Sequence, residues 1–263
     1  MSAPPLFHLT RGSAPLLVSF PHSGTYLPPD IAARMTPAAL TLPDTDWHAP
    51  LLYKFLDAMG ASRLEATHSR YVVDLNRPPD DKELYAGQKK TGLVPLDSFA
   101  GQTLYREGAA PTPEEIIARR KFWQPYHDAL AQELSRLKAI HGSVVLWDAH
   151  SIESVLPSLF EGRLPDLNLG TFDGKSCDSD IVEAVFGVAK QSSFSAVLNA
   201  RFKGGYITRH YGAPKKGIQA IQLEMAQSIY MDEAPPFTFR PDRAAKVTTA
   251  IRGMIKAALD SLV

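Results

Sequence analysis

Two histidines in this chain follow short runs of apolar residues. His22 follows the run at residues 16–20, and His150 follows the run at residues 144–147, with Asp148 two positions before it. Because parallel strands bring their carboxyl ends to one edge of a sheet, we expect the two histidines to lie close together. Neutral imidazole is a preferred zinc ligand, and a carboxylate often orients it. The pair therefore indicates a metal site, and the competing interpretation of each residue is that it caps a turn.

A carboxylate is needed to complete such a site. Catalytic zinc is commonly held by two histidines and one carboxylate, and the fourth position is left to water. The cluster DTDWH at residues 44–48 precedes a helical pattern at residues 49–59. We assign Asp46 as the third ligand, with Asp44 and His48 as alternatives. The competing interpretation is helix capping, which favours Asp and Thr at such positions.

A glutamate, Glu224, ends the apolar run at residues 218–223. Burying an unpaired carboxylate is costly, so we expect this side chain to reach a partner or a cavity. In metal-assisted hydrolysis a glutamate of this kind takes a proton from the attacking water and passes it to the leaving nitrogen. Glu224 is therefore the predicted general base, and the alternative is a structural salt bridge.

Two further segments carry groups that suit a substrate with carboxylates. Residues 69–78 resemble an apolar strand that ends in Asn76 and Arg77, and Arg70 lies near its start. Arginine presents a fixed fork to carboxylates and can also stabilise negative charge on a carbonyl oxygen. A surface salt bridge is the alternative for any single arginine.

The second segment, residues 204–212, is flanked by glycine and contains Arg209 and His210. It suits a loop that folds over a polar substrate. The other histidines have no nearby metal-spaced partner, and we interpret them as surface or helix-packing residues: His8, His68, His127 and His141. Cys177 and Ser151 lack a catalytic context and receive no role.

The elements that must position these residues alternate along the chain. Short β-rich apolar runs at residues 16–20, 144–147 and 218–223 predict buried strands. Amphipathic patterns predict helices at residues 49–59, 114–140, 180–190 and 243–262. This alternation favours an α/β fold with a mixed, mostly parallel sheet flanked by helices.

Irregular features interrupt this pattern in three places. Pro125 should kink or divide the helix at residues 114–140, because proline removes a helical hydrogen bond. Residues 78–113 and 154–178 exceed the usual length of a connecting loop. Long loops in compact domains often act in function, so we expect these two to form walls or lids over the site.

Composition narrows the partner to a small molecule. The 263 residues suit one domain over positions 1–263, and Lys plus Arg equals Asp plus Glu at 28 each, which argues against nucleic-acid binding. Cys177 alone cannot form an internal disulfide, and the first residues lack the pattern of a signal peptide. No apolar run approaches the roughly 18 residues that span a bilayer. We therefore expect a cytoplasmic protein without a membrane role.

Seven short motifs occur in one order over residues 16–231: PHSG, DTDWH, SRYVVDLNRP, LYAG, WDAHS, GGYITRHYG and QLEM. In this combination the chain resembles the N-formylglutamate amidohydrolases of histidine degradation. That family is similar to the zinc peptidase-like (phosphorylase/hydrolase-like) folds of carboxypeptidases and aspartoacylases. Their usual pattern is His-x-x-Glu, then Asn-Arg, a later zinc-binding His and a catalytic Glu. His22, Asn76-Arg77, His150 and Glu224 match this order, and Arg70 matches an arginine that aspartoacylases use near the substrate.

The chain departs from that pattern at Thr25, which stands where the group has its glutamate ligand. Threonine cannot readily replace a carboxylate on zinc, so Asp46 is placed there. The resemblance then implies that zinc, or another divalent metal, is held by His22, Asp46 and His150.

The implied reaction is hydrolysis of N-formyl-L-glutamate to formate and L-glutamate. Glu224 would act as the base and Arg77 would stabilise the oxyanion. Arg70 and Arg209 would hold the two carboxylates, with Asn76 and His210 also at the substrate. One alternative is a deacylase for another N-acyl amino acid, such as acetylaspartate, or a small carboxypeptidase. A non-catalytic binding protein with a structural metal is a further alternative, but such sites usually contain cysteine ligands, and Cys177 lies outside every motif.

Overall fold

The computed structural model describes residues 3–82 and 91–262, so the LYAG motif at residues 84–87 lies outside the described residues. A seven-stranded sheet runs through the molecule in the order β1-β3-β2-β4-β7-β5-β6. The strands are β1 (Phe7–Thr10), β2 (Leu16–Phe20), β3 (Ser62–Ala66), β4 (Val144–Ile152), β5 (Leu167–Gly170), β6 (Ala196–Leu198) and β7 (Ile218–Ala226). The β1–β3 and β5–β7 pairs are antiparallel and the other pairs are parallel.

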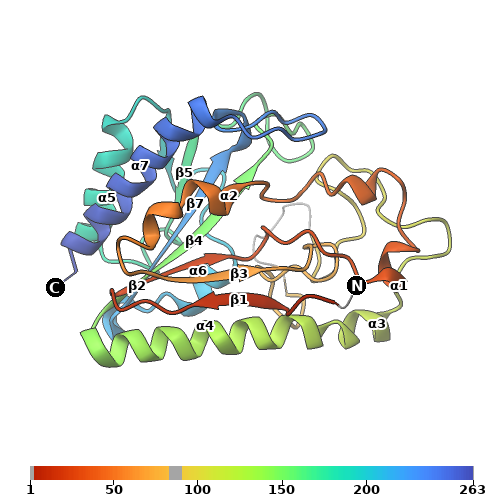
Figure 1. Ribbon diagram of the computed structural model, residues 1–263, viewed down its shortest axis with the longest axis horizontal. Coiled ribbons are helices and arrows are strands. Elements are labelled where there is room, and N and C mark those ends of the chain that lie inside the picture. The colour runs from red at the N-terminus through yellow and green to blue at the C-terminus, as the bar shows by residue number, and fades with distance from the viewer. Residues whose placement is uncertain (1–2, 83–90, 263) are drawn as a thin grey trace.

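Helices cover both faces of this sheet (Figure 1). The α-helices are α1 (Pro29–Ala32), α2 (Ala49–Leu52), α3 (Pro113–Ala118), α4 (Arg120–His141), α5 (Ser179–Gln191), α6 (Tyr206–Tyr211) and α7 (Pro241–Asp260). Short 3₁₀ turns are η1 (Ala39–Thr41), η2 (Lys54–Leu56), η3 (Pro214–Lys216) and η4 (Gln227–Ile229). The mixed, mostly parallel sheet flanked by helices confirms the predicted fold class. Within the described residues, none of the helices is long and apolar enough to cross a membrane.

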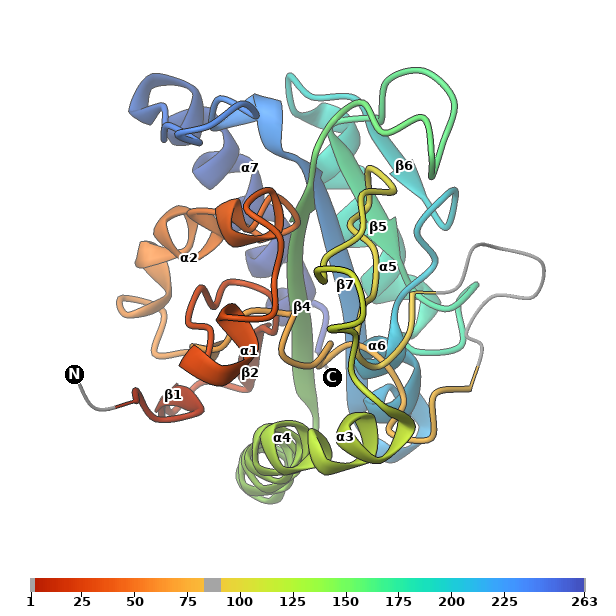
Figure 2. The ribbon, with the colours of Figure 1, turned by 90° about the vertical axis from the view of Figure 1, so that its right-hand side faces the viewer.

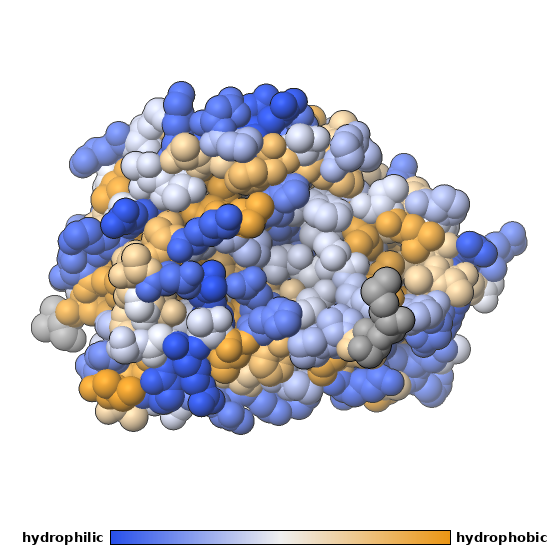
Figure 3. All heavy atoms as spheres, in the orientation of Figure 1, coloured by the Kyte–Doolittle hydropathy of each residue, from blue (hydrophilic) through white to orange (hydrophobic). Residues whose placement is uncertain are grey.

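The central strands are buried on both faces, which explains their continuous apolar sequence. In β2, Leu16, Val18 and Phe20 pack on the side of α2, α5 and α7, whereas Leu17 packs on the side of α4. A strand covered on both faces needs apolar side chains at every position rather than at alternate ones. On the outer face shown in Figure 3, hydrophilic side chains alternate with small hydrophobic patches, as is usual for a protein that folds around its own core.

Two of the predicted helices differ from the structure. The helix predicted at residues 114–140 divides at Arg119, and Pro125 lies inside α4. A proline ring disturbs the carbonyl four residues before it, so the break falls about one turn ahead of Pro125. The helix predicted at residues 49–59 is wrong as a single element, because the backbone at Tyr53 leaves helical geometry between α2 and η2.

Two segments singled out for their arginines also fold differently. Residues 70–77 form successive turns rather than the predicted strand, and the NH of Asp74 pairs with the carbonyl of Leu93 instead of a sheet neighbour. The segment at residues 204–212 contains the helix α6 where a loop was expected. The long connection at residues 154–178 contains the strand β5, which pairs with β7 and β6.

The two long connections approach the carboxyl ends of the central strands. In Figure 2 the yellow segment after residue 91 crosses in front of β4 and β7. Phe99 and Thr91 from this segment and Leu159 from the second connection line a cavity of about 100 Å³. The expected walls over the site are therefore present at this edge of the sheet.

Candidate active site

β4 and β7 carry two pairs of polar side chains, of which His150, Gln222 and Glu224 line one cavity. Their parallel register aligns Asp148 with Gln222 and His150 with Glu224. Side chains two positions apart on a strand point to the same face, so all four side chains lie on one side of the sheet. Both strands extend beyond their predicted ends, and the polar residues lie within the strands rather than after them. His150 and Glu224 consequently have the rigid backbone of a central sheet.

His22, Asp46 and His150 converge on one point. All three residues are buried, and one ligand atom of each lies within 4.8 Å of the others, so that the group could hold a metal ion. Asp46 Oδ2 is 3.2 Å from His150 Nδ1 and 3.9 Å from His22 Nδ1. Thr25 is exposed and does not belong to this group.

The donor set fits zinc in both chemistry and spacing. Zn–N and Zn–O bonds of about 2.0–2.1 Å place tetrahedral ligand atoms about 3.3 Å apart, which is close to the separations around Asp46. Two imidazoles and one carboxylate are three protein ligands, as in catalytic rather than structural zinc sites. The alternatives Asp44 and His48 have other partners: Asp44 Oδ2 accepts from the NH of Phe99, and His48 Nε2 contacts the carbonyl of Phe237.

A second carboxylate orients each histidine of the group. His22 Nε2 is 2.7 Å from Asp74 Oδ1, and His150 Nε2 is 3.0 Å from Asp148 Oδ2. Each Nδ1 is thereby turned towards Asp46. This arrangement of carboxylate, histidine and metal fixes the tautomer and the ring orientation of a ligand. The predicted orienting role suits Asp148, and Asp74 is an equivalent partner that the sequence reasoning missed.

Burial and neighbouring charges shift the pKa values of His22 and His150 in opposite directions. Burial and the guanidinium of Arg70 lower the pKa of His22 and outweigh the neighbouring carboxylates. Burial also disfavours a charged His150, but Asp148 and Asp46 outweigh it and hold the pKa of His150 well above its ordinary value. A metal ion must therefore displace a proton from the imidazole of His150.

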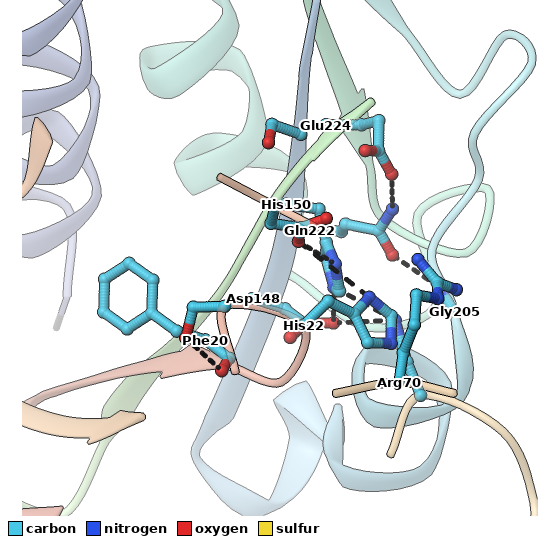
Figure 4. Close-up of polar contacts among 12 residues, drawn as sticks. Phe20, His22, Arg70, Asp148, His150, Gly205, Gln222 and Glu224 are labelled. Atoms are coloured by element: carbon cyan, nitrogen blue, oxygen red, sulfur yellow. Dashed lines mark hydrogen bonds and ion pairs between the residues drawn. The ribbon is translucent and has the colours of Figure 1, made fainter. Parts of the chain in front are cut away.

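Glu224 lies beside the metal-binding group and is held by Gln222 (Figure 4). Gln222 Nε2 donates to Glu224 Oε2 at 3.2 Å, and Gln222 Oε1 accepts from the NH of Gly205 at 2.6 Å. Burial raises the pKa of Glu224 to about 8, with His150 acting in the opposite direction. A carboxyl group with such a pKa can hold and release a proton near neutral pH.

Arg70, Asn76 and Arg77 all line the cavity. Arg70 donates to Asp74 Oδ2 at 2.7 Å, so Asp74 joins this arginine to His22. Arg77 is held by Thr91, whose carbonyl accepts from its Nε at 3.0 Å. These contacts fix both guanidinium groups at the rim of the metal-binding group.

Asn76 lines the cavity and also contacts His150, Asp148 and the backbone of α6. Its Nδ2 is 3.0 Å from His150 Nε2 and 3.4 Å from Asp148 Oδ2, and its Oδ1 accepts from the NH of Ile207 at the start of α6. A Cβ on Gly205 would lie 2.3 Å from Asn76 Nδ2, so glycine is required for this close approach. Asn76 therefore joins α6 to the histidine side of the cavity.

Arg209 and His210 do not line the cavity in the described part of the chain. Both lie on α6, where Arg209 Nε donates to the carbonyl of Gly204 and its guanidinium lies over the ring of Phe172. His210 is exposed and stacks on Tyr206. The expected loop is a helix, and its turn directs these side chains elsewhere.

Arg201 lines the cavity where the sequence pointed to Arg209. Its Nε donates to the carbonyl of Leu159 at 2.9 Å, so it lies next to the wall from the second long connection. The sequence reasoning missed Arg201, Gln222 and Asp74. Only Asp74 carries a signal of its own, since a carboxylate between apolar neighbours is expected to have a partner.

Together, a buried His-Asp-His group, a glutamate with a raised pKa and three arginines define a candidate hydrolase site with a metal-binding group on an α/β sheet. The family described as N-formylglutamate amidohydrolase matches residues 14–231. The chain belongs to this family, as predicted.

Individual relatives agree with this assignment. A curated N-formylglutamate deformylase from Pseudomonas putida is 50% identical over 96% of this chain and 94% of the relative. Another from Pseudomonas aeruginosa is 53% identical over 95% of this chain and 94% of the relative. The crystal structure of an N-formylglutamate amidohydrolase from Ralstonia eutropha JMP134 is 23% identical, has a TM-score of 0.81 and covers 95% of this chain and 96% of its own. This last similarity shows that the fold is shared.

Proposed function

We propose that this chain hydrolyses N-formyl-L-glutamate to formate and L-glutamate with the help of zinc, in cytoplasmic histidine degradation. The observation that carries the proposal is the convergence of His22, Asp46 and His150 beside Glu224 in one arginine-lined cavity. The two curated deformylases, similar over nearly the whole chain, support the choice of substrate.

The metal would be held by His22 Nδ1, His150 Nδ1 and Asp46 Oδ2, with Asp74 and Asp148 orienting the imidazoles. A zinc ion there supplies Lewis acidity, which lowers the pKa of water and polarises a carbonyl group. The set has no cysteine and leaves a fourth position, as catalytic zinc sites do. This favours an enzyme over a binding protein with a structural metal.

Glu224 moves the protons of the reaction. Its Oε2 is occupied by Gln222, so we assign Oε1 to accept a proton from the attacking water. The same carboxyl group then donates this proton to the nitrogen as the C–N bond breaks. The amine leaves with glutamate, and the oxygen of water remains in formate. A carboxyl with a pKa of about 8 suits both steps, because it can gain and lose a proton near neutral pH.

The arginines divide the negative charges of the substrate. Arg77, fixed by Thr91, would stabilise the charge that develops on the formyl oxygen. Arg70 and Arg201 would bind the two carboxylates of the glutamyl part, because both line the cavity. Arg201 thus takes the role that the sequence gave to Arg209. Asn76 remains at the substrate and also positions His150.

One assay tests the proposal against its alternatives. Product release is measured from N-formylglutamate, N-acetylglutamate and N-acetylaspartate, with added zinc and with a chelator. We expect formate from N-formylglutamate, loss of activity with the chelator and recovery with zinc. Faster turnover of an acetylated substrate would instead identify a deacylase for another N-acyl amino acid. Activity that persists in a metal-free preparation would refute the zinc dependence.

A further inference from the structure

Asp46 differs from the two histidines of the metal-binding group in what holds it. His150 lies in β4, where sheet hydrogen bonds fix its backbone, and His22 lies two residues after the end of β2. Asp46 lies on a turn between η1 and α2, and its NH donates to the carbonyl of His22. An aspartate side chain has only two rotatable bonds, so its carboxylate can go only where the backbone allows. The position of this ligand therefore depends on what fixes the turn.

The carbonyls on both sides of Asp46 accept hydrogen bonds from side chains of the turn that follows β7, where Gln227 begins η4 and Tyr230 directly follows it. Gln227 Nε2 donates to the carbonyl of Thr45 at 2.8 Å. The hydroxyl of Tyr230 donates to the carbonyl of Trp47 at 2.9 Å. The peptide groups that flank Asp46 are consequently held from one direction.

Ser151 joins these two donors. Its Oγ is 2.7 Å from the hydroxyl oxygen of Tyr230 and 3.3 Å from Gln227 Nε2. The hydroxyl of Tyr230 is the donor towards Ser151 Oγ as well as towards the Trp47 carbonyl, and Ser151 Oγ also accepts from Gln227 Nε2. The three side chains are at most 3% exposed. Buried hydrogen-bonded networks make the groups that they join more rigid.

We propose that Gln227, Tyr230 and Ser151 form a clamp that positions Asp46 as a metal ligand. The clamp acts on Asp46 through the backbone of its turn, so its members are positioning residues. The inference rests on the metal-binding group of the proposed function. Loss of a group that orients a metal ligand typically weakens metal binding about 10- to 100-fold, and we expect this range for the clamp.

The test measures the dissociation constant of zinc by competition with a chromophoric chelator, together with kcat and KM. Tyr230→Phe removes only the hydroxyl, and Gln227→Met removes both donors at similar size. Tyr126→Phe is the matched control, because Tyr126 is also fully buried and its hydroxyl bonds to the carbonyl of Leu64 and to Ser19. We expect each clamp variant to bind zinc at least tenfold more weakly, and the control to stay within twofold of the wild type.

A second comparison repeats Tyr230→Phe and Gln227→Met in the Asp46→Ala protein. With the ligand gone, neither change should weaken zinc binding further. The clamp is refuted if both clamp variants bind zinc as the control does, or if their effects persist without Asp46. Zinc binding that is equal in the wild type and in the clamp variants would refute the clamp alone. Absence of zinc binding by the wild type would refute both the metal-binding group and the clamp.

Discussion

Glu224→Gln distinguishes a catalytic glutamate from a structural one. The substitution keeps the size of the side chain and keeps an oxygen that can accept from Gln222 Nε2. It removes the group that takes a proton from water. A positioned general base contributes roughly 100- to 10,000-fold to the rate, which corresponds to about 3–5 kcal/mol of barrier. We expect kcat to fall by this factor while the protein retains its zinc.

Although kcat should fall, the free energy of unfolding of the variant should exceed that of the wild type as pH rises. Burial raises the pKa of Glu224 from 4.5 to about 8. A raised carboxyl pKa means that the stability contributed by this group is full below pH 4.5 and is lost as pH rises towards 8. At about 1.4 kcal/mol per pH unit, the wild type should lose about 3 kcal/mol relative to Glu224→Gln between roughly pH 5 and pH 8.

The assay uses one preparation of each protein. Formate release and zinc content are measured at neutral pH, and urea unfolding is measured with a chelator at about pH 5 and pH 8, on either side of the expected transition. The variant should be nearly inactive and, at the higher pH, at least as stable as the wild type. Nearly wild-type turnover with a lower free energy of unfolding would show that Glu224 is a salt-bridge partner, and the proposed mechanism would lack its base.

Three further changes test other parts of the site and fold. Asp46→Ala should weaken zinc binding as strongly as His22→Ala, as measured by metal analysis after dialysis; the assignment moves to Asp44 or His48 if alanine there has this effect instead. Arg201→Gln should lower kcat/KM about 10- to 100-fold for N-formylglutamate and much less for N-formylglutamine. Arg209→Gln, which lies outside the cavity lining, should change kcat/KM for neither substrate. Equal effects of Arg201→Gln on both substrates would contradict a carboxylate contact. Burial lowers the pKa of His127 from 6.5 to about 3. Its contribution to stability is therefore full above pH 6.5 and is lost as the pH decreases below that value. The wild type should lose about 2 kcal/mol of unfolding free energy between pH 7 and 5, and His127→Phe should lose less by that amount in urea titrations; parallel titrations of the two proteins would refute this.

The sequence predicts the strands that carry the site because these strands are buried on both faces. β2, β4 and β7 contain apolar runs that no surface element would have. The ends of β4 and β7 are not predictable in the same way, because His150 and Glu224 face a cavity and interrupt the apolar pattern. β1 is a four-residue edge strand with half of its residues exposed, so its pattern is too short to recognise.

The candidate metal ligands could be predicted because their residue types follow strand-like runs, whereas their supports depend on tertiary contacts. His22 and Asp74 are 52 residues apart, and Gln227 and Thr45 are 182 apart. Neither pairing has a local pattern. Arg209 is selected by its glycine-rich surroundings, but helical geometry in α6 directs it away from the cavity, and Arg201 takes its place in the lining.

β2, β4 and β7 are neighbours in the sheet, although β2 ends at Phe20 and β4 begins only at Val144. Parallel pairing across such separations closes long stretches of chain before the contacts form, which makes folding slow. The side chains carried by these strands therefore meet late, after both pairings exist. A metal ion held as proposed by His22, which follows β2, and by His150 in β4 would bind the folding transition state only weakly. Zinc bound as proposed should accordingly slow unfolding rather than accelerate folding.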